Sequence, residues 1–314
     1  MFDAVPPWNA IAAEVTGPNA FLWALGTYVS MILIERISYI FHERKNWNER
    51  DARQNVLNSS LNAIGDSFIG GPLFVGIYFL VYEHLRLFDI PFLWWGWVLA
   101  FLLNDLAYYV DHRIAHRTGF FWAIHTAHHS SKEMNLTVSS RGTLLSLGGT
   151  MSPAYFALLA LVGVPFAMFI AAKFFGNLWG IFNHTRLIRR MGVLDEVLAT
   201  PANHRVHHGT EAKYLDKNYG QVLIMWDRLF GTFQREEVET TFGLVKQLKS
   251  DRIWDIQTSG AQWLIGEIRS APRWQDRLRY LIMPPGWRHD GCHLTTAQIR
   301  AGVPGCIAGA PISV

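Results

Sequence analysis

Residues 112–129 read HRIAHRTGFFWAIHTAHH and contain five of the thirteen histidines in the chain. His112 and His116 are four residues apart, and His125 is followed three residues later by the pair His128-His129. Spacings of three and four place side chains on one face of a helix, where two imidazoles can bind the same metal ion. The stretch therefore predicts helices that bind metal.

Four further histidines extend the pattern. His184 stands alone, and His204, His207 and His208 repeat the spacing of the second group. Buried imidazoles without partners are costly, neutral imidazole is the commonest metal ligand, and nine imidazoles are too many for one ion. We therefore predict a dinuclear centre with nine candidate ligands: His112, His116, His125, His128, His129, His184, His204, His207 and His208. Imidazole suits iron, copper, nickel and zinc, so the spacing leaves the metal open.

Composition indicates a membrane protein. Half of the residues are hydrophobic and 17% are charged, against about 25% in soluble domains. Five apolar stretches approach the roughly 20 residues that a membrane-spanning helix needs: residues 21–41, 61–82, 92–110, 144–162 and 165–182. Glu35-Arg36 make the first the weakest, and Gly163-Val164-Pro165 predict that residues 144–183 form a transmembrane hairpin. We expect an all-α integral membrane bundle of four to five transmembrane helices, with a cytoplasmic helical cap that carries the metal site.

The distribution of basic residues predicts the orientation. Lys and Arg are frequent in residues 35–59, in residues 111–143 and after His184, whereas the short loop before Pro91 holds Arg86 alone. Basic segments favour the cytoplasm, so the N-terminus is expected outside, and the histidines and the C-terminus inside. All four histidine groups would then meet at one membrane face. A metal transporter is an alternative function for such a protein, but it would place its ligands near the midplane of the bilayer instead.

The chain divides into five expected regions: an N-terminal segment 1–20, transmembrane helices 21–110, a catalytic region 111–233, a cytoplasmic region 234–290 and a poorly ordered tail 291–314. In the fourth region Ile253, Ile256, Trp263, Leu264 and Ile268 fall near one helical face. That face can lie on the membrane surface or pack on the cytoplasmic domain. The formal net charge of +3 is too small to suggest a nucleic-acid partner.

The histidine pattern and its neighbours resemble the fatty acid hydroxylase and sterol desaturase superfamily. The resemblance covers about residues 104–233. Its other motifs are Asp105-Leu-Ala-Tyr-Tyr109, Asn135-Leu-Thr with Arg141 beyond, Thr200-Pro201, Lys217-Asn-Tyr-Gly220 and Trp226-Asp-Arg-Leu-Phe-Gly-Thr-Phe233. Two later motifs, Phe242-Gly-Leu-Val and Pro285-Gly-Trp287, look like the alkylglycerol monooxygenase branch.

This resemblance implies a di-iron centre that uses O2 to hydroxylate a membrane lipid, either sterol-like or with a fatty-acyl or alkyl chain. Desaturation by the same centre is the alternative outcome. All nine histidines would hold the two iron ions, with no catalytic residue beyond the metal centre, and a separate redox partner would supply electrons as an external donor. We expect Asp105, Asp111 and Asp227 to orient imidazoles; a role in a turn or cap is the alternative for Asp227.

Overall fold

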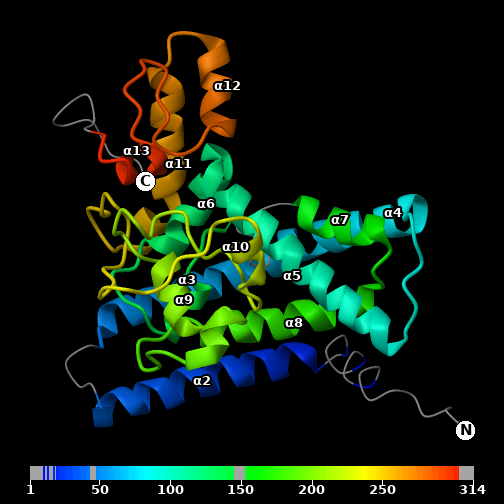
Figure 1. The fold of residues 1–314 in the computed structure, drawn as a ribbon. Helices are drawn as coiled ribbons and strands as arrows, with labels where there is room; N and C mark the ends of the chain where they lie inside the picture. The colour runs from blue at the N-terminus through cyan, green and yellow to red at the C-terminus, as the bar shows by residue number, and fades with distance from the viewer. Residues whose placement is uncertain are drawn as a thin grey trace, which may run out of the picture.

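The computed structural model describes residues 19–42, 47–144 and 153–303, together with positions 10, 13 and 17. Figure 1 shows helices throughout these ranges. Their bounds are α2 Ala20–His42, α3 Glu49–Gly65, the π-helix η1 Asp66–Gly70, α4 Gly71–Leu85, α5 Trp94–Arg117, α6 Gly119–His129, the 3₁₀ turn η2 Leu136–Ser140, α7 Pro153–Val162, α8 Phe166–Phe182, the 3₁₀ turn η4 Gly192–Glu196, α9 Pro201–His207, α10 Met225–Leu229, α11 Ile253–Ser270, α12 Trp274–Ile282 and α13 Thr296–Arg300. Within the described ranges the only β pairing is two isolated bridges. The all-α prediction is confirmed for this part of the chain.

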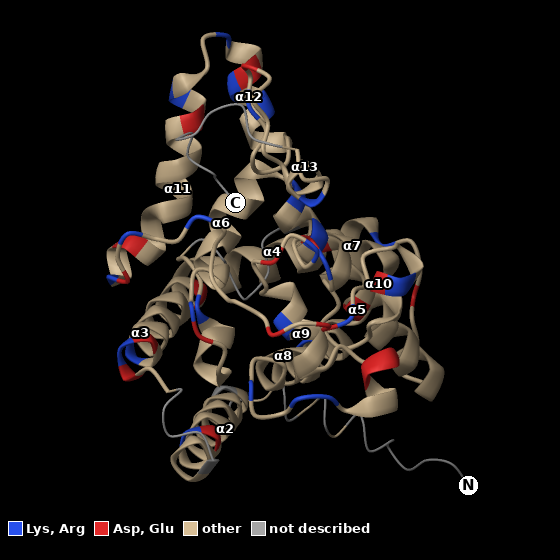
Figure 2. Cartoon of the chain, turned by 60° about the vertical axis from the view of Figure 1, so that its left-hand side comes forward, with Lys and Arg blue, Asp and Glu red and all other residues tan. Residues whose placement is uncertain are grey.

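Helix α2 exposes apolar side chains along most of its length. Leu22, Ile34 and Phe41 are each more than 60% exposed, and in Figure 2 the charged colours on α2 are confined to one place, which corresponds to Glu35 and Arg36. Residues Leu22–Phe41 are long and apolar enough to cross a membrane, and only 11% of their most apolar window is buried. Water is a poor solvent for such a surface, whereas lipid is a good one.

The second candidate span is longer than the sequence suggests. Helices α3, η1 and α4 run on without a break from Glu49 to Leu85, whereas the apolar stretch begins only at residue 61. Asn48 starts the helix early, because its side chain accepts hydrogen bonds from the backbone N–H groups of Arg50 and Asp51. The polar first half is stable because Asn55 and Asn58 are fully buried against the rest of the molecule.

The other apolar stretches pack into the bundle core. Tyr78 of α4, Phe156 of α7 and Phe169 of α8 are buried in one cluster. Helix α8 follows the predicted stretch 165–182 closely, whereas the first arm of the hairpin is described only from Pro153, and residues 145–152 lie outside the described part. Among the described residues, Leu22–Phe41 and Glu49–Leu85 are the segments with the length and apolarity of a membrane span.

Helix α6 is fixed by two close approaches. A Cβ on Gly119, at its first residue, would lie 2.1 Å from the carbonyl oxygen of Tyr280 in α12. A Cβ on Gly260 of α11 would lie 1.9 Å from the carbonyl oxygen of Ala123 in α6. Glycine alone permits both contacts, so α11 and α12 are packed tightly on the helix that carries His125, His128 and His129.

Packing on α6 also accounts for the amphipathic face expected in the region 234–290. Ile256 and Leu264 are buried, and α11 packs on α6 through this face. In the tail expected to be poorly ordered, Thr296–Arg300 form a helix with a capping box between Thr295 and Gln298. The last part of the tail, 304–314, lies outside the described residues.

Candidate metal centre

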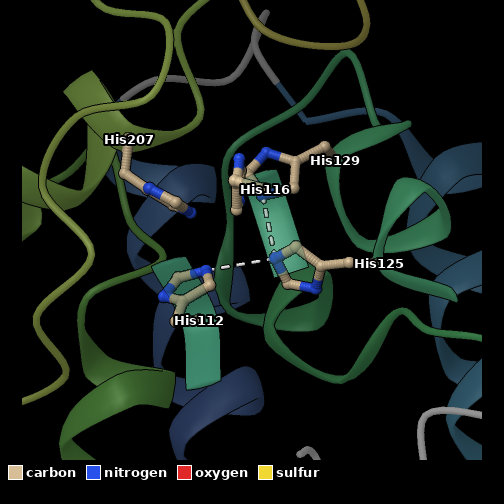
Figure 3. A group of neighbouring side chains, drawn as sticks. All are labelled: His112, His116, His125, His129 and His207. Carbon is tan, nitrogen blue, oxygen red and sulfur yellow. Dashed lines mark hydrogen bonds between the residues drawn. The ribbon is translucent and has the colours of Figure 1, made fainter. Parts of the chain in front are cut away.

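The nine predicted histidines all come together in the fold. Their ring nitrogens form two compact groups, in each of which the ligand atoms lie within 4.8 Å of one another. The larger group, shown in Figure 3, is His112, His116, His125, His129 and His207. The smaller group is His128, His184, His204 and His208. The groups are adjacent, since the His129 and His208 rings stack with centroids 4.4 Å apart.

The two three-histidine motifs contribute in opposite proportions. Helix α6 gives His125 and His129 to the larger group and His128 to the smaller one. The motif in α9 gives His204 and His208 to the smaller group and His207 to the larger one. Residues four apart share a helical face, and the residue between them points to a neighbouring face, so each helix serves both groups.

The spacing of ring nitrogens matches shared coordination better than hydrogen bonding. In the larger group His125 Nε2 lies 3.1 Å from both His112 Nε2 and His129 Nε2. In the smaller group His204 Nε2 lies 2.9 Å from His184 Nε2 and 3.1 Å from His208 Nε2. A ring nitrogen carries either a proton or a lone pair, so it cannot donate to one neighbour and accept from another. Two nitrogens about 2.1 Å from one ion, at right angles, would lie about 3 Å apart.

Two further observations fit metal ligands. The Nε2 atoms of His116 and His207 are buried and make no hydrogen bond to the described residues, which is costly unless another group occupies the space between them. In four of the histidines, the Nδ1 atom donates a hydrogen bond to a backbone carbonyl oxygen at 2.7–3.2 Å. The pairs are His112 with Tyr219, His128 with Arg141, His184 with Gly180 and His207 with Lys217. A proton fixed on Nδ1 leaves the Nε2 lone pair available for a metal.

The turn that follows α9 orients two candidate ligands of the larger group. The carbonyl oxygens of Lys217 and Tyr219 each accept a hydrogen bond from an imidazole, His207 and His112 respectively. Asn218 adopts φ 55°, in the left-handed region that asparagine tolerates. A Cβ on Gly220 would lie 2.5 Å from the Leu223 carbonyl oxygen. The motif Lys217-Asn-Tyr-Gly220 therefore owes its composition to the shape of this turn.

Two of the three predicted carboxylates hold this loop. Asp227 accepts hydrogen bonds from the N–H groups of Tyr219 and Gly220, both at 2.8 Å. Asp105 accepts from the N–H groups of Val222 and Leu223 and from the Trp226 indole. Neither bonds directly to an imidazole in the described structure. Asp227 reaches His112 through the Tyr219 peptide, so its role combines the two that we considered, an orienting carboxylate and a turn residue.

Two further carboxylates near the larger group are Asp111 and Asp216. Asp111 is 4% exposed and directly precedes His112. Asp216, which the sequence analysis missed, lies 3.6 Å from His116 Nδ1 and 3.3 Å from an Arg117 nitrogen. Burial acts to raise the pKa of Asp216, but its interactions with His116 and Arg117 outweigh burial and hold that pKa below the usual value. Its position next to Lys217 in a recognised motif was the one available signal.

The smaller group is braced by a buried cation and an acidic side chain from α2. Arg141, whose carbonyl oxygen binds His128, donates to Asp51 and Asn55 of α3, each at 2.9 Å. Glu35 accepts from the Thr185 hydroxyl, next to His184, and from the Leu136 N–H. In the sequence Arg141 stood only as part of a motif, and Glu35 as an interruption of a span. In the structure Arg141 contacts the candidate ligand His128, and Glu35 contacts the neighbour of the candidate ligand His184.

Burial favours the neutral form of eight of the nine imidazoles. Loss of solvation, reinforced by repulsion between neighbouring rings, lowers the pKa of seven of them well below the usual 6.5: His112, His125, His129, His184, His204, His207 and His208. Burial likewise lowers the pKa of His128 to about 4. Neutral imidazoles at pH 7 are available as ligands without first losing a proton.

Cavities reach the centre from two sides. The first, the α2–α8 cavity, measures about 470 Å³ and runs between α2, α3 and α8 to His125, His128 and His184. The second, the α6–α11 cavity, measures about 600 Å³ and lies between α6, α11 and residues 244–250. Trp122 lines the second cavity, and its ring is 5.0 Å from that of His116 and 5.6 Å from that of His129.

Comparison with known proteins agrees with this geometry. The family model of the fatty acid hydroxylases matches residues 97–232, which contain all nine histidines. The chain contains a domain of the fatty acid hydroxylase family. The predicted resemblance is thus confirmed. The match runs from the first turn of α5 to the loop that follows α10.

Several characterised relatives are similar to this hydroxylase-family chain. Alkylglycerol monooxygenase of Homo sapiens is 31% identical over 83% of this chain and 58% of its own length. Ornithine lipid hydroxylase OlsE of Rhizobium tropici is 31% identical over 43% of this chain and 41% of its own. A Delta(7)-sterol 5(6)-desaturase of Candida dubliniensis is 26% identical over 53% and 41%. The chain spans about half the length of these relatives, and no solved structure gave a significant match.

Proposed function

We propose that the chain is a membrane-embedded, O2-dependent hydroxylase that acts on a membrane lipid, with two iron ions held by the nine histidines. The observation that carries the proposal is the division of nine imidazoles, eight of them buried and His128 partly buried, into one group of five and one of four. Two adjacent ions would satisfy every converging Nε2 atom. Iron is chosen over other metals that imidazole suits because the relatives named above are a monooxygenase, a hydroxylase and a desaturase.

The bound iron would supply the power to activate O2 and attack an unactivated C–H bond. In the overall reaction one oxygen atom enters the C–H bond and the other leaves as water, which consumes two electrons and two protons from an external donor. The protein would orient the imidazoles, and it would keep bulk water away from a centre in which eight of the nine histidines are buried.

The α2–α8 cavity is the site we propose for the lipid. It opens along α2, the helix with the most exposed apolar surface, and it ends at ligands from both histidine groups. Among the described residues that line it, Arg141 is the one Lys or Arg, and its guanidinium is already bound by Asp51 and Asn55. Polar side chains such as Tyr28, Asn62 and Asn177 line the same space. An uncharged polar head group near the metals suits this lining better than a phosphate.

The membrane placement follows the same reasoning. We propose four to five spans, with the N-terminus outside and the histidine face and C-terminal region in the cytoplasm. The exposed apolar surface of α2 and the apolar α4 half of the helix Glu49–Leu85 support the spans. The α6–α11 cavity would then face the cytoplasm. Since Trp122 separates that cavity from His116 and His129, it is where we place the approach of the external electron donor.

One experiment tests the metal and the reaction together. Purified, active protein should contain two iron ions per chain, and His207→Ala or His184→Ala, one from each group, should lower that content while the protein still inserts into membranes. Incubated with lipid and ¹⁸O2, the enzyme should leave one labelled oxygen atom in the product. At most one metal ion per active chain would refute the dinuclear centre, whereas an unlabelled, desaturated lipid would establish the alternative reaction.

A further inference from the structure

Helix α12 carries an apolar stripe on its outer face. Trp274, Leu278 and Ile282 are 66%, 51% and 67% exposed. They are four residues apart, so at about 100° per residue they fall within one quarter of the helix surface. Asp276 and Tyr280, at 8% and 3% exposure, lie on the opposite side of the helix. The stripe therefore points directly away from the protein body, and packing on α11 does not require it.

Exposure of this stripe to water is costly. Removal of a large apolar side chain from water is favourable in proportion to the apolar area that is buried, and here three such side chains stand in one row. Single exposed hydrophobic residues are normal in proteins, but contiguous ones mark contact with another phase or molecule. Something that is apolar is therefore expected to cover Trp274, Leu278 and Ile282 in the working protein.

The charges beside the stripe indicate what covers it. Residues 269–282 contain Arg269, Arg273, Arg277 and Arg279 but only one acidic residue, Asp276. Arg269 and Arg273 are exposed and make no ion pair with the described residues. A short helix with a tryptophan on its apolar face and arginines beside it is typical of helices that lie in the head-group region of a bilayer.

The direction of α12 agrees with this position. In Figures 1 and 2, α11 and α12 run across the direction of α2, and α12 lies on the side of α11 that faces α7. A helix that runs across a membrane-spanning helix can lie along the membrane surface. Because the buried side of α12 faces α11, the stripe looks toward the side of the molecule that holds the apolar helices α4 and α7.

We propose that α12 lies along the surface of the bilayer, with Trp274, Leu278 and Ile282 among the lipids and the neighbouring arginines at anionic head groups. The inference rests on the membrane placement proposed above for α2. It assigns the membrane contact to α12, whereas the sequence offered the face of α11 as a candidate for membrane contact or for packing. The Met283 carbonyl oxygen, just after α12, accepts a hydrogen bond from the Gly119 N–H at the start of α6. The contact of α12 with the membrane would therefore also position α6, which carries three of the histidines.

Site-specific fluorescence tests the proposal. The full chain with Cys292→Ser and Cys306→Ser would carry one new cysteine with a polarity-sensitive fluorophore, and it would be placed in phosphatidylcholine nanodiscs with and without phosphatidylserine. Leu278→Cys and Ile282→Cys report on the stripe, and Gln262→Cys, exposed on α11, is the matched control. Leu33→Cys on α2 reports on the span.

Nitroxide carried on lipid chains should quench the fluorophore at positions 278 and 282 several-fold more than at 262. Phosphatidylserine should increase that difference, and Arg273→Gln with Arg277→Gln should reduce it. Quenching at position 33 but not at 278 would overturn the proposal while leaving α2 in the membrane. A fluorophore at 278 that is shielded from water but not quenched would show that protein covers the stripe, which also overturns it. Absence of quenching at both 33 and 278 would refute the membrane placement itself.

Discussion

The buried imidazole cluster predicts that the metal-free protein is unusually sensitive to acid. In the folded chain the pKa of His128 is about 4, and burial holds that of seven other ligands well below 6.5. In the unfolded chain each imidazole returns to its ordinary pKa of about 6.5. The unfolded state then binds more protons, so the contribution of these groups to stability is present above pH 6.5 and is lost as the pH falls below it.

The size of the effect follows from the number of groups. At pH 5.5, one unit below the unfolded pKa, each group that stays neutral in the folded chain costs about 1.4 kcal/mol. Eight such groups together cost about 11 kcal/mol, which is comparable with the whole stability of an ordinary domain, about 5–15 kcal/mol. Metal-free protein should therefore unfold between pH 6.5 and 5.5, whereas bound metal should delay the loss, because a coordinated nitrogen cannot take up a proton.

Denaturant titrations of the detergent-purified protein, with and without a chelator, measure this difference. His128→Gln should reduce the pH slope by about one proton, or 1.4 kcal/mol per pH unit. His84→Gln is the control, since His84 is exposed and outside the cluster, and it should leave the slope unchanged. A free energy of unfolding of metal-free protein that changes by less than about 3 kcal/mol between pH 7.5 and 5.5 would refute the buried, neutral cluster.

Two further predictions concern residues that support the site, and a third concerns the orientation of the chain in the membrane. Asp227→Asn removes one of the carboxylate oxygens that hold the Tyr219 and Gly220 N–H groups; it should lower metal content, and unchanged metal binding would show that the turn holds without it. Arg141→Gln leaves Asp51 buried without its cation and should cost about 3–5 kcal/mol in the free energy of unfolding; a loss below about 1 kcal/mol would contradict the bracing role. In a background without cysteine, Arg53→Cys and Arg189→Cys, both at exposed positions, should react with an impermeant reagent from the cytoplasmic side and Asp89→Cys from the outside. Reaction of positions 53 and 189 from opposite sides would rule out the proposed orientation.

Spacing along the sequence predicts local geometry within a helix. The histidines show that it does not predict how separate helices meet. The separations in residues 112–129 and 204–208 place imidazoles on common helical faces, so their convergence was predictable. Their division into groups of five and four was not, because it depends on how α6 and α9 meet. Asp216 and Glu35 gave no spacing signal, since each acts on a residue that is far away in the sequence or on a different helix.

The polar half of α3 shows the same limit. By composition residues 49–60 look like a solvated cytoplasmic segment, yet Asn55 and Asn58 are buried. Asn55 is hydrogen-bonded to Asp51, Thr137 and Arg141, and Gln257 of α11 reaches Asn58. Hydropathy cannot distinguish polar residues that face water from polar residues that satisfy one another inside the protein.

Because α6 and α9 each contribute histidines to both groups, the position of either helix affects both groups at once. A rotation of either helix by one residue would remove ligands from both groups at the same time, because each helix supplies two nitrogens to one and a third to the other. An insertion or deletion within either motif therefore has no outcome in which one site is lost and the other kept.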